Sequence, residues 1–328
     1  MNRLSRLYLL ALVLAPVAVA QLTSLSVIDY PGAIFTNLAG INDAGDIVGS
    51  YTTPDNKMHG LLLRGGQFTT IDFPDAVYTL AIGINRGGDI AGTYRDPSGK
   101  QHGYLLSGGR FTTIDFPGAE MSYPTGINAK REMSGMHWNP SGDNKHRGYL
   151  FSGGRFTSLE YAAPNLMSCF FDINDQGDMV GHWEDTSRVR HLWLLRQGKS
   201  SSIDLPGAQE TMVGIGGITS AGDILGPYAD PRGKTKAFLL SKGSFTPFDV
   251  PGSRQTFAQR MNASGRIVGR FVDAGGVTHG FLTRVTPASR SRLLTVDDDG
   301  ADCPGALRTI QVAVAQAPAG ATIQVCPG

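Results

Sequence analysis

Apolar and polar residues along this chain follow a pattern that repeats six times, with a period of 43 to 46 residues. Within each copy, short apolar runs alternate with clusters of Gly, Pro, Asn and Asp, a pattern typical of strands and turns. In the second copy the expected strands cover residues 79–84, 89–95, 102–107 and 110–116. A unit of this size cannot bury its apolar faces alone, so we expect the copies to stack around a shared core.

Turns and buried strands predict the architecture of one unit. Residues 85–88 and 108–109 suit tight hairpins, which need positive φ. The third strand is apolar on consecutive positions, as at 104–106, which indicates cover on both faces. Four antiparallel strands clamped between neighbours make one blade of a β-propeller. The Gly that ends the GDIVG-like segment, within the second strand, is expected to permit close approach of neighbouring sheets. It recurs as Gly49, Gly92, Gly135, Gly181, Gly226 and Gly269.

The two ends of the array predict how the ring closes. The sixth copy stops after its third strand, at 280–283, and the missing fourth strand lies at the other end of the array, at 25–31. We therefore expect an all-β fold, a six-bladed β-propeller of four-stranded antiparallel blades whose last blade is completed by the N-terminal strand. A β-solenoid of the same period is the alternative, but it gives no reason for this complementary deficit. The expected propeller spans 21–285, with copies at about 36–73, 79–116, 122–161, 168–205, 212–250 and 256–284, the last joined by 24–30.

The first twenty residues have the layout of a secretory signal peptide. Arg3 and Arg6 precede an apolar stretch at 7–15, and small residues at 18–20 mark a cleavage position before Gln21. We expect export and a secreted, extracellular or periplasmic protein. The apolar stretch is short for a bilayer span and no cysteine follows it to take a lipid, so a membrane anchor is the weaker alternative.

Composition and charge narrow the class of partner. Charged residues make up 17 % and Gly numbers 43, which favours turn-rich β-structure over helical bundles. The net charge is +1, and loss of Arg3 and Arg6 with the leader leaves 27 basic residues against 28 acidic ones. Without a basic stripe the chain is not expected to bind nucleic acid or an anionic membrane surface. We expect a monomer without stable membrane insertion.

The repeated signatures GIND..GDIVG, HGFLL and FTTIDFPG resemble those of the bacterial extracellular HAF repeat family. The resemblance covers roughly residues 22–285. It implies a secreted, β-propeller-like array with no settled biochemical activity. The fourth copy departs most from the pattern, because the sequence at 159–162 replaces IDFP and His191-Leu192 replaces His-Gly.

The last residues follow a different pattern. After a linker at 286–292, the segment 293–328 contains a helical stretch at 309–316 with strand-like runs on either side, an expected β-α-β tail. It resembles the start of a right-handed parallel β-helix of the pectin-lyase type, and we expect a truncated, weakly packed piece without catalytic residues. Cys303 and Cys326 are candidates for a disulfide, whereas Cys169 is expected to be a small buried residue.

The long connections of each blade are the expected binding surface. They include TYRDPSGKQ at 93–101 and DFPGAEMSYP at 115–124 and fall on one face, opposite the tight turns. At the start of the third strand near this face, every copy carries a basic or titratable residue, namely His59, His102, Arg147, His191, Lys236 and His279. One interpretation is a ring that attracts an anionic ligand such as an acidic polysaccharide. The favoured alternative is that each side chain bonds a neighbouring loop.

Blades three and four break the pattern at the end of the second strand. His137 and Trp183 occupy the place where other copies have Tyr, so ordinary packing is the favoured interpretation. Trp138 and His182 lie one step away from that place. Exposed Trp and His side chains beside polar loops suit stacking on sugar faces, so all four are candidate ligand contacts.

Motifs of catalysis and metal binding are missing from the sequence. HExxH, GxSxG, CxxC and phosphate-loop patterns do not occur, and the four histidines of the third-strand set are spread over separate blades, so we expect no metal and no cofactor. The Asn of the GIN segment is better explained by a turn than by a calcium loop; it recurs as Asn42, Asn85, Asn128, Asn174 and Asn262, with Thr219 in the fifth copy.

The function we expect is extracellular ligand binding without catalysis, with a polysaccharide as the favoured ligand. The first alternative is a lyase or hydrolase acting on carbohydrate through carboxylates in the central channel. The second alternative is a scaffold that contacts other proteins. Glycan binding separates the first hypothesis from the scaffold, and turnover of a polysaccharide is the mark of the enzyme.

Overall fold

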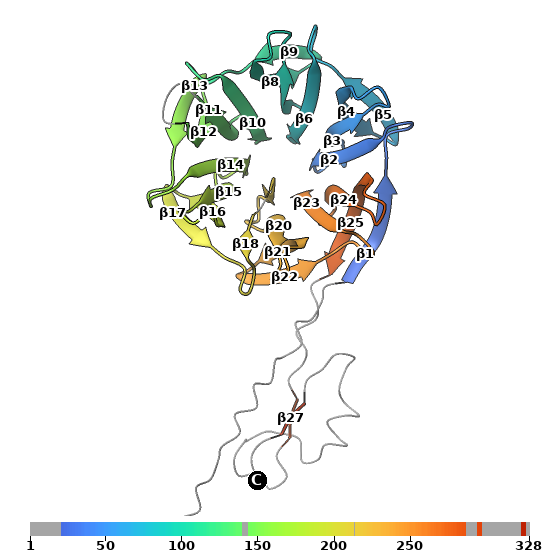
Figure 1. Ribbon diagram of the computed structural model, residues 1–328, viewed down its shortest axis with the longest axis vertical. Helices are drawn as coiled ribbons and strands as arrows, with labels where there is room; N and C mark the ends of the chain where they lie inside the picture. Colours follow the sequence, from blue (N-terminus) through green and yellow to red (C-terminus); the bar gives the residue numbers. More distant parts are fainter. Residues whose placement is uncertain (1–20, 140–143, 213, 287–293, 297–322, 326–328) are drawn as a thin grey trace, which may run out of the picture. The chain divides into compact units, whose positions relative to one another are not determined.

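The computed structural model describes residues 21–139, 144–212, 214–286, 294–296 and 323–325. The strands from Gln21 to Thr286 form a ring of blades around a central axis (Figure 1). The described residues contain no helix, so none has the length and hydropathy needed to cross a bilayer. The expected all-β, six-bladed propeller is confirmed.

Each blade has its first strand at the channel and its last strand at the periphery (Figure 1). Successive strands of a blade pair antiparallel, and single parallel bridges at Phe35↔Thr278 and Met121↔Gln101 connect two pairs of neighbouring blades. The strands are, in blade one, β2 Phe35–Ile41, β3 Ile47–Thr52, β4 Met58–Arg64 and β5 Gln67–Ile71; in blade two, β6 Tyr78–Ile84, β7 Ile90–Arg95, β8 Gln101–Ser107 and β9 Arg110–Thr113; in blade three, β10 Met121–Ile127, β11 Met133–Trp138, β12 His146–Ser152 and β13 Arg155–Leu159.

The other three blades follow the same order. They are, in blade four, β14 Met167–Ile173, β15 Met179–Glu184, β16 Arg190–Arg196 and β17 Lys199–Ile203; in blade five, β18 Glu210–Thr211, β19 Gly217–Ile218, β20 Ile224–Ala229, β21 Thr235–Ser241 and β22 Ser244–Phe248; in blade six, β23 Gln255–Met261, β24 Ile267–Val272, β25 Thr278–Thr286 and β1 Gln21–Ile28. Only blade five has its inner strand in two pieces.

Blade six is completed by the N-terminal strand, as predicted. β1 pairs antiparallel with β25 in the register Ser26↔Leu282, and Asp29 accepts a hydrogen bond from His279 at 2.7 Å. Tyr30, just after β1, stacks on Tyr51 of blade one with ring centroids 3.6 Å apart. The two ends of the array are therefore joined by backbone pairing and by aromatic packing.

The same aromatic contact recurs at other blade boundaries. A ring after the fourth strand of one blade stacks on a ring at the end of the second strand of the next, at centroid distances of 3.6 Å for Phe73 and Tyr94 and 3.7 Å for Phe116 and His137. These stacks bury the apolar parts of otherwise polar strands. They explain why the IDFP segment recurs in the sequence.

The repeated Gly at the end of the GDIVG-type segment has a reason different from the predicted one. A Cβ on Gly92 would lie 2.0 Å from the carbonyl oxygen of Leu80, which belongs to the inner strand of the same blade. The predicted approach of a neighbouring sheet is therefore wrong for this Gly. It holds instead for the Gly of the His-Gly pair, because a Cβ on Gly103 would lie 2.6 Å from Cδ of Pro124 in the next blade.

Beyond Thr286 the structure describes one two-stranded parallel sheet, formed by β26 (Leu294–Val296) and β27 (Ile323–Val325). The expected helix at 309–316, the candidate disulfide between Cys303 and Cys326 and the expected signal peptide at 1–20 lie outside the described residues. Cys169 is buried and free.

Candidate ligand-binding site at the mouth of the central channel

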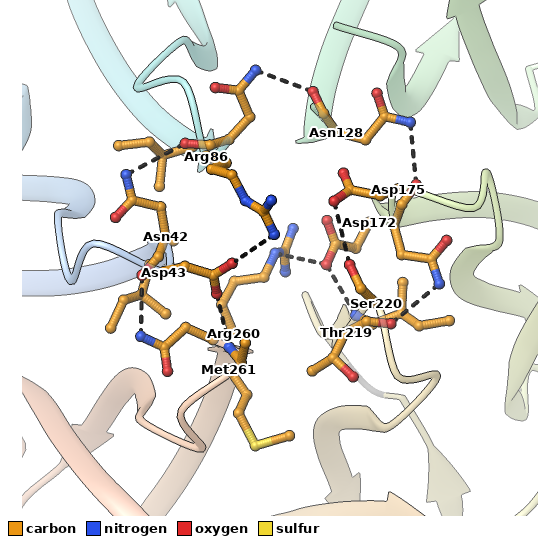
Figure 2. A pocket seen from close by; sticks show the side chains of 18 of the residues that line it. Asn42, Asp43, Arg86, Asn128, Asp172, Asp175, Thr219, Ser220, Arg260 and Met261 are labelled. Atoms are coloured by element: carbon orange, nitrogen blue, oxygen red, sulfur yellow. Dashed lines mark hydrogen bonds and ion pairs between the residues drawn. The ribbon is translucent and has the colours of Figure 1, made fainter. Parts of the chain in front are cut away.

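A cavity of about 290 Å³ lies at one mouth of the central channel. It is lined by the tight turns between the first and second strands, with contributions from every blade (Figure 2). The cavity is therefore on the face of the short turns, opposite the long connections on which the sequence analysis expected a binding surface.

The wall of the cavity is a ring of turns tied together by asparagine side chains. Asn42 Nδ2 donates to the carbonyl oxygen of Asn85 in the next blade at 3.3 Å, while its Oδ1 accepts from the backbone N–H of Asp46 at 2.9 Å. The same link to the next blade is made by Asn85, Asn128, Asn174 and Asn262. Thr219 has no amide to donate, so the ring is open between blades five and six. These bonds account for the Asn of the GIN segment as a turn residue.

The residue after this Asn lies on the rim, and here the copies differ. The six rim residues, in blade order, are Asp43, Arg86, Ala129, Asp175, Ser220 and Ala263. Both rim carboxylates accept a hydrogen bond of 2.9 Å from the backbone N–H of the rim Ala in the preceding blade. Arg86 pairs with Asp43 at 3.3 Å, and the Ser220 hydroxyl donates to Asp175 at 3.4 Å.

The floor of the cavity is formed by an ion pair that crosses the channel. Asp172 of blade four and Arg260 of blade six stand where other blades have Gly, and Arg260 Nε lies 3.1 Å from Asp172 Oδ2. The same carboxylate oxygen accepts from the backbone N–H of Ile218 at 2.9 Å. Burial raises the pKa of Asp172 and is opposed by the charge of Arg260, whose own pKa burial lowers.

The guanidinium group of Arg260 also binds backbone carbonyl groups beneath the cavity. Besides Asp172, it donates to the carbonyl oxygens of Thr125 at 2.9 Å, Gln259 at 3.0 Å and Phe171 at 2.5 Å, and to that of Gly216. These acceptors lie in blades three to six. The four terminal N–H donors therefore have four carbonyl acceptors and Nε is ion-paired with Asp172, which holds the guanidinium group in place.

The residues of this site escaped the sequence analysis, although signals for them exist. The residue two places before the turn Asn, or before Thr219 in the fifth copy, is Gly in four copies, but it is Asp172 in the fourth and Arg260 in the sixth. Thr211 and Ile218 are seven positions apart, whereas the matching Thr79 and Ile84 are five apart, so blade five carries a two-residue insertion in its inner strand.

The predicted ring of basic residues on the third strands does not converge on a common site. Each side chain is paired with an acid in its own blade, at 2.6 to 3.1 Å: His59 with Asp72, His102 with Asp115, Arg147 with Glu160, His191 with Asp204, Lys236 with Asp230, and His279 with Asp29. None of the six lines the cavity. Their role in attracting an anionic ligand stays a prediction.

The candidate residues of blades three and four are also apart from the cavity. His137 stacks on Phe116 and lies 2.9 Å from the hydroxyl of Ser158, while Trp183 donates to Ser202 at 3.0 Å. The stack joins blades two and three, and the two polar contacts lie within blades three and four. Burial lowers the pKa of His137 to about 4.

Trp138 and His182 have different surroundings. Trp138 stacks on His146 and donates to Asn144 at 3.0 Å on the long-connection side. His182 was expected to be exposed, and this is wrong: it lies buried against blade five, where Nδ1 donates to the carbonyl oxygen of Met212 at 3.0 Å. Burial lowers its pKa to about 4. Among the described residues, no group of three or more His, Cys, Asp or Glu is placed to hold a metal ion.

No family model and no curated protein sequence matches the chain, so its resemblance to HAF repeats stays a prediction. Solved structures do match in fold. A six-bladed β-propeller lectin from Aleuria aurantia is 10 % identical over 79 % of this chain and 99 % of its own, with a TM-score of 0.52. The AofleA protein of Arthrobotrys oligospora is 10 % identical over 83 % and 91 %, with a TM-score of 0.51. TolB from Acinetobacter baumannii is 13 % identical over 74 % and 65 %, with a TM-score of 0.52.

Proposed function

We propose that the protein is an exported binding protein without catalytic activity, and that it holds a carbohydrate in the cavity at the channel mouth. One observation carries the proposal. The turn Asn recurs in five of six copies, because the fold uses it, whereas the adjacent rim position varies among Asp, Arg, Ala and Ser. The rim position faces a cavity, and its residue differs from copy to copy. Specificity for a ligand is expected at such a position.

The chemistry of the rim suits a ligand rich in hydroxyl groups. Asp43 and Asp175 offer carboxylate oxygens as acceptors, and Arg86, with 71 % of its side chain exposed, offers N–H donors beyond the one it gives to Asp43. Mixed donors and acceptors around a small cavity match the alternating roles of sugar hydroxyls.

The test compares the two faces of the propeller. Binding of the purified protein is first measured on a glycan array that includes fucose, the sugar recognised by the Aleuria aurantia lectin. The ligand found is then titrated by calorimetry into the wild type, Asp175→Asn, Arg86→Gln and the control Trp138→Ala. We expect each rim change to weaken binding by at least tenfold, since it removes a charged hydrogen-bond partner, and Trp138→Ala to change it by less than twofold.

The reverse pattern would place the ligand on the long-connection face, near Trp138. Absence of any glycan ligand would reject carbohydrate binding and favour the scaffold hypothesis, which is then tested with candidate protein partners.

A hydrolytic enzyme is the second candidate, favoured by the raised pKa of Asp172 in a cavity that also contains Asp175. A carboxyl group with a raised pKa is typical of a general acid in glycoside hydrolysis. The ion pair with Arg260 weighs against this role, because it occupies Asp172. Release of reducing ends from a polysaccharide panel, abolished by Asp172→Asn at unchanged stability, would establish the enzyme.

A further inference from the structure

We infer that the cavity receives the terminal unit of a neutral carbohydrate chain and does not accept internal units. This inference rests on the proposed function and names the part of the ligand that is recognised. It follows from three features of the site: a closed floor, a rigid wall and an excess of negative charge.

The floor is closed by packing as well as by the ion pair. A Cβ added to Gly126 would lie 2.6 Å from Cα of Asp172, and one added to Gly217 would lie 2.7 Å from Cδ of Arg260. A methyl group therefore has no room beside these side chains. Because Arg260 donates four hydrogen bonds to carbonyl oxygens and is ion-paired with Asp172, its guanidinium group does not swing aside without losing several buried interactions. A sugar chain cannot pass this point.

The wall restricts access to one direction. The Asn links tie the turns of neighbouring blades at five of the six boundaries around the mouth (Figure 2). With the floor closed, the cavity is accessible from the short-turn face. Its volume of about 290 Å³ is just below the range for small-molecule sites, about 300–1,000 Å³. A cavity of this size suits one or two sugar rings. An internal sugar unit has further units attached on both sides. A cavity that is closed at its floor is a dead end and has space for the chain on one side only.

The charges around the cavity favour a neutral sugar over an acidic one. Asp43 is paired with Arg86, and Asp172 with Arg260. Asp175 is bonded to Ser220 and to the backbone N–H of Ala129, and no Lys or Arg of the described residues forms an ion pair with it. The carboxylate of a uronic acid therefore meets an uncompensated negative charge at the mouth, while neutral hydroxyls donate to the same oxygens.

Dependence of affinity on chain length tests the inference. The probes are methyl glycosides of fucose, galactose, glucose and mannose, the matching di- and tetrasaccharides, and glucuronic and galacturonic acid, each titrated by calorimetry. For the sugar that binds, we expect dissociation constants of the monosaccharide and the tetrasaccharide within threefold of each other, and binding of the uronic acids at least tenfold weaker. An affinity that rises more than tenfold with chain length would overturn the dead end, and tighter binding of a uronic acid would overturn the neutral class.

A blocking variant with a matched control locates the effect. Ala129→Trp places a large side chain on the exposed rim and is expected to weaken binding of every chain length at least tenfold. Ser98→Trp, at an exposed position of a long connection, is expected to leave binding within twofold. Unchanged binding by Ala129→Trp would reject the cavity as the site. If no probe binds the wild type, it is carbohydrate binding itself that fails.

Discussion

Blades one and five carry the same repeat, but their inner strands are built differently. In blade one, β2 is a continuous strand of seven residues, with one register shift between Leu38 and Gly40. In blade five, β18 and β19 have two residues each, because the two inserted residues do not fit into the ladder. In blade one β2 pairs with β3 along its length, whereas in blade five only the two short pieces pair with β20, and side chains of neighbouring blades pack at the break.

The neighbours of blade five have larger side chains where other blades are small. Leu192 replaces the Gly of the His-Gly pair and packs with Met212, and His182 stands where blade one has Ser50. Arg260 reaches in from blade six to the carbonyl of Gly216. A propeller therefore tolerates a broken inner strand when side chains of adjacent blades fill the space. At this break one of those side chains, Arg260, also forms the floor of the cavity.

The largest expected effect comes from removing the cation of the floor. Arg260→Met leaves the carboxylate of Asp172 buried without its partner, and loss of one member of a buried ion pair costs about 3–5 kcal/mol. We therefore expect the free energy of unfolding, measured in urea, to fall by that amount.

The double variant Asp172→Gly with Arg260→Gly is the matched control, since Gly40, Gly83 and Gly126 hold these places in the first three blades. It removes both charges, so its loss should be smaller than that of Arg260→Met. If the free energy of unfolding of Arg260→Met falls by less than 1 kcal/mol, the side-chain contacts of Arg260 do not stabilise blade five.

The next effect concerns His182 and pH. Its pKa is about 4 in the folded protein and about 6.5 in the unfolded chain. Between these two pH values the unfolded chain therefore binds a proton at His182 and the folded protein does not. The stability contribution is complete above pH 6.5 and is lost as the pH falls toward 4, by about 3 kcal/mol for this gap. Met136 holds the same place in blade three, so His182→Met should lose less stability between pH 7.5 and 4.5 than the wild type.

The control for this experiment is His279→Gln, which removes a histidine of raised pKa on the outside of blade six. Both variants are unfolded in urea at the two pH values. Equal pH dependence in wild type and His182→Met would mean that His182 is not held neutral at the break.

The smallest expected effect is at the Asn ring. Asn42→Thr copies blade five into blade one and removes the donor to the carbonyl of Asn85, at a cost of about 1 kcal/mol. Thr219→Asn makes the opposite exchange and should gain up to about 1 kcal/mol by closing the ring between blades five and six. Thermal unfolding of both variants measures the difference. A lower melting temperature for Thr219→Asn would show that the break in the inner strand of blade five extends into the turn that follows it.

Much of the architecture could be predicted because local chemistry specifies it. Hairpin glycines such as Gly88 and Gly108 do adopt positive φ, and the pairing of β1 with β25 was foreseen from the missing fourth strand. The site could not be predicted in the same way. Trp183 was a candidate ligand contact for which ordinary packing was the favoured interpretation, and its indole N–H donates to the hydroxyl of Ser202 on the fourth strand of its own blade.

By itself the sequence determined the strands, the turns, the number of blades and the closure of the ring, because each depends on residues close together or on a repeated unit. Only the tertiary structure decided which breaks in the repeat matter. Asp172 and Arg260 are 88 positions apart, and in the sequence each is only an isolated departure from the repeat. In the ring, Arg260 Nε lies 3.1 Å from Asp172 Oδ2 across the channel. Their meaning depends on which side chains face the axis, and that is a property of six blades packed together.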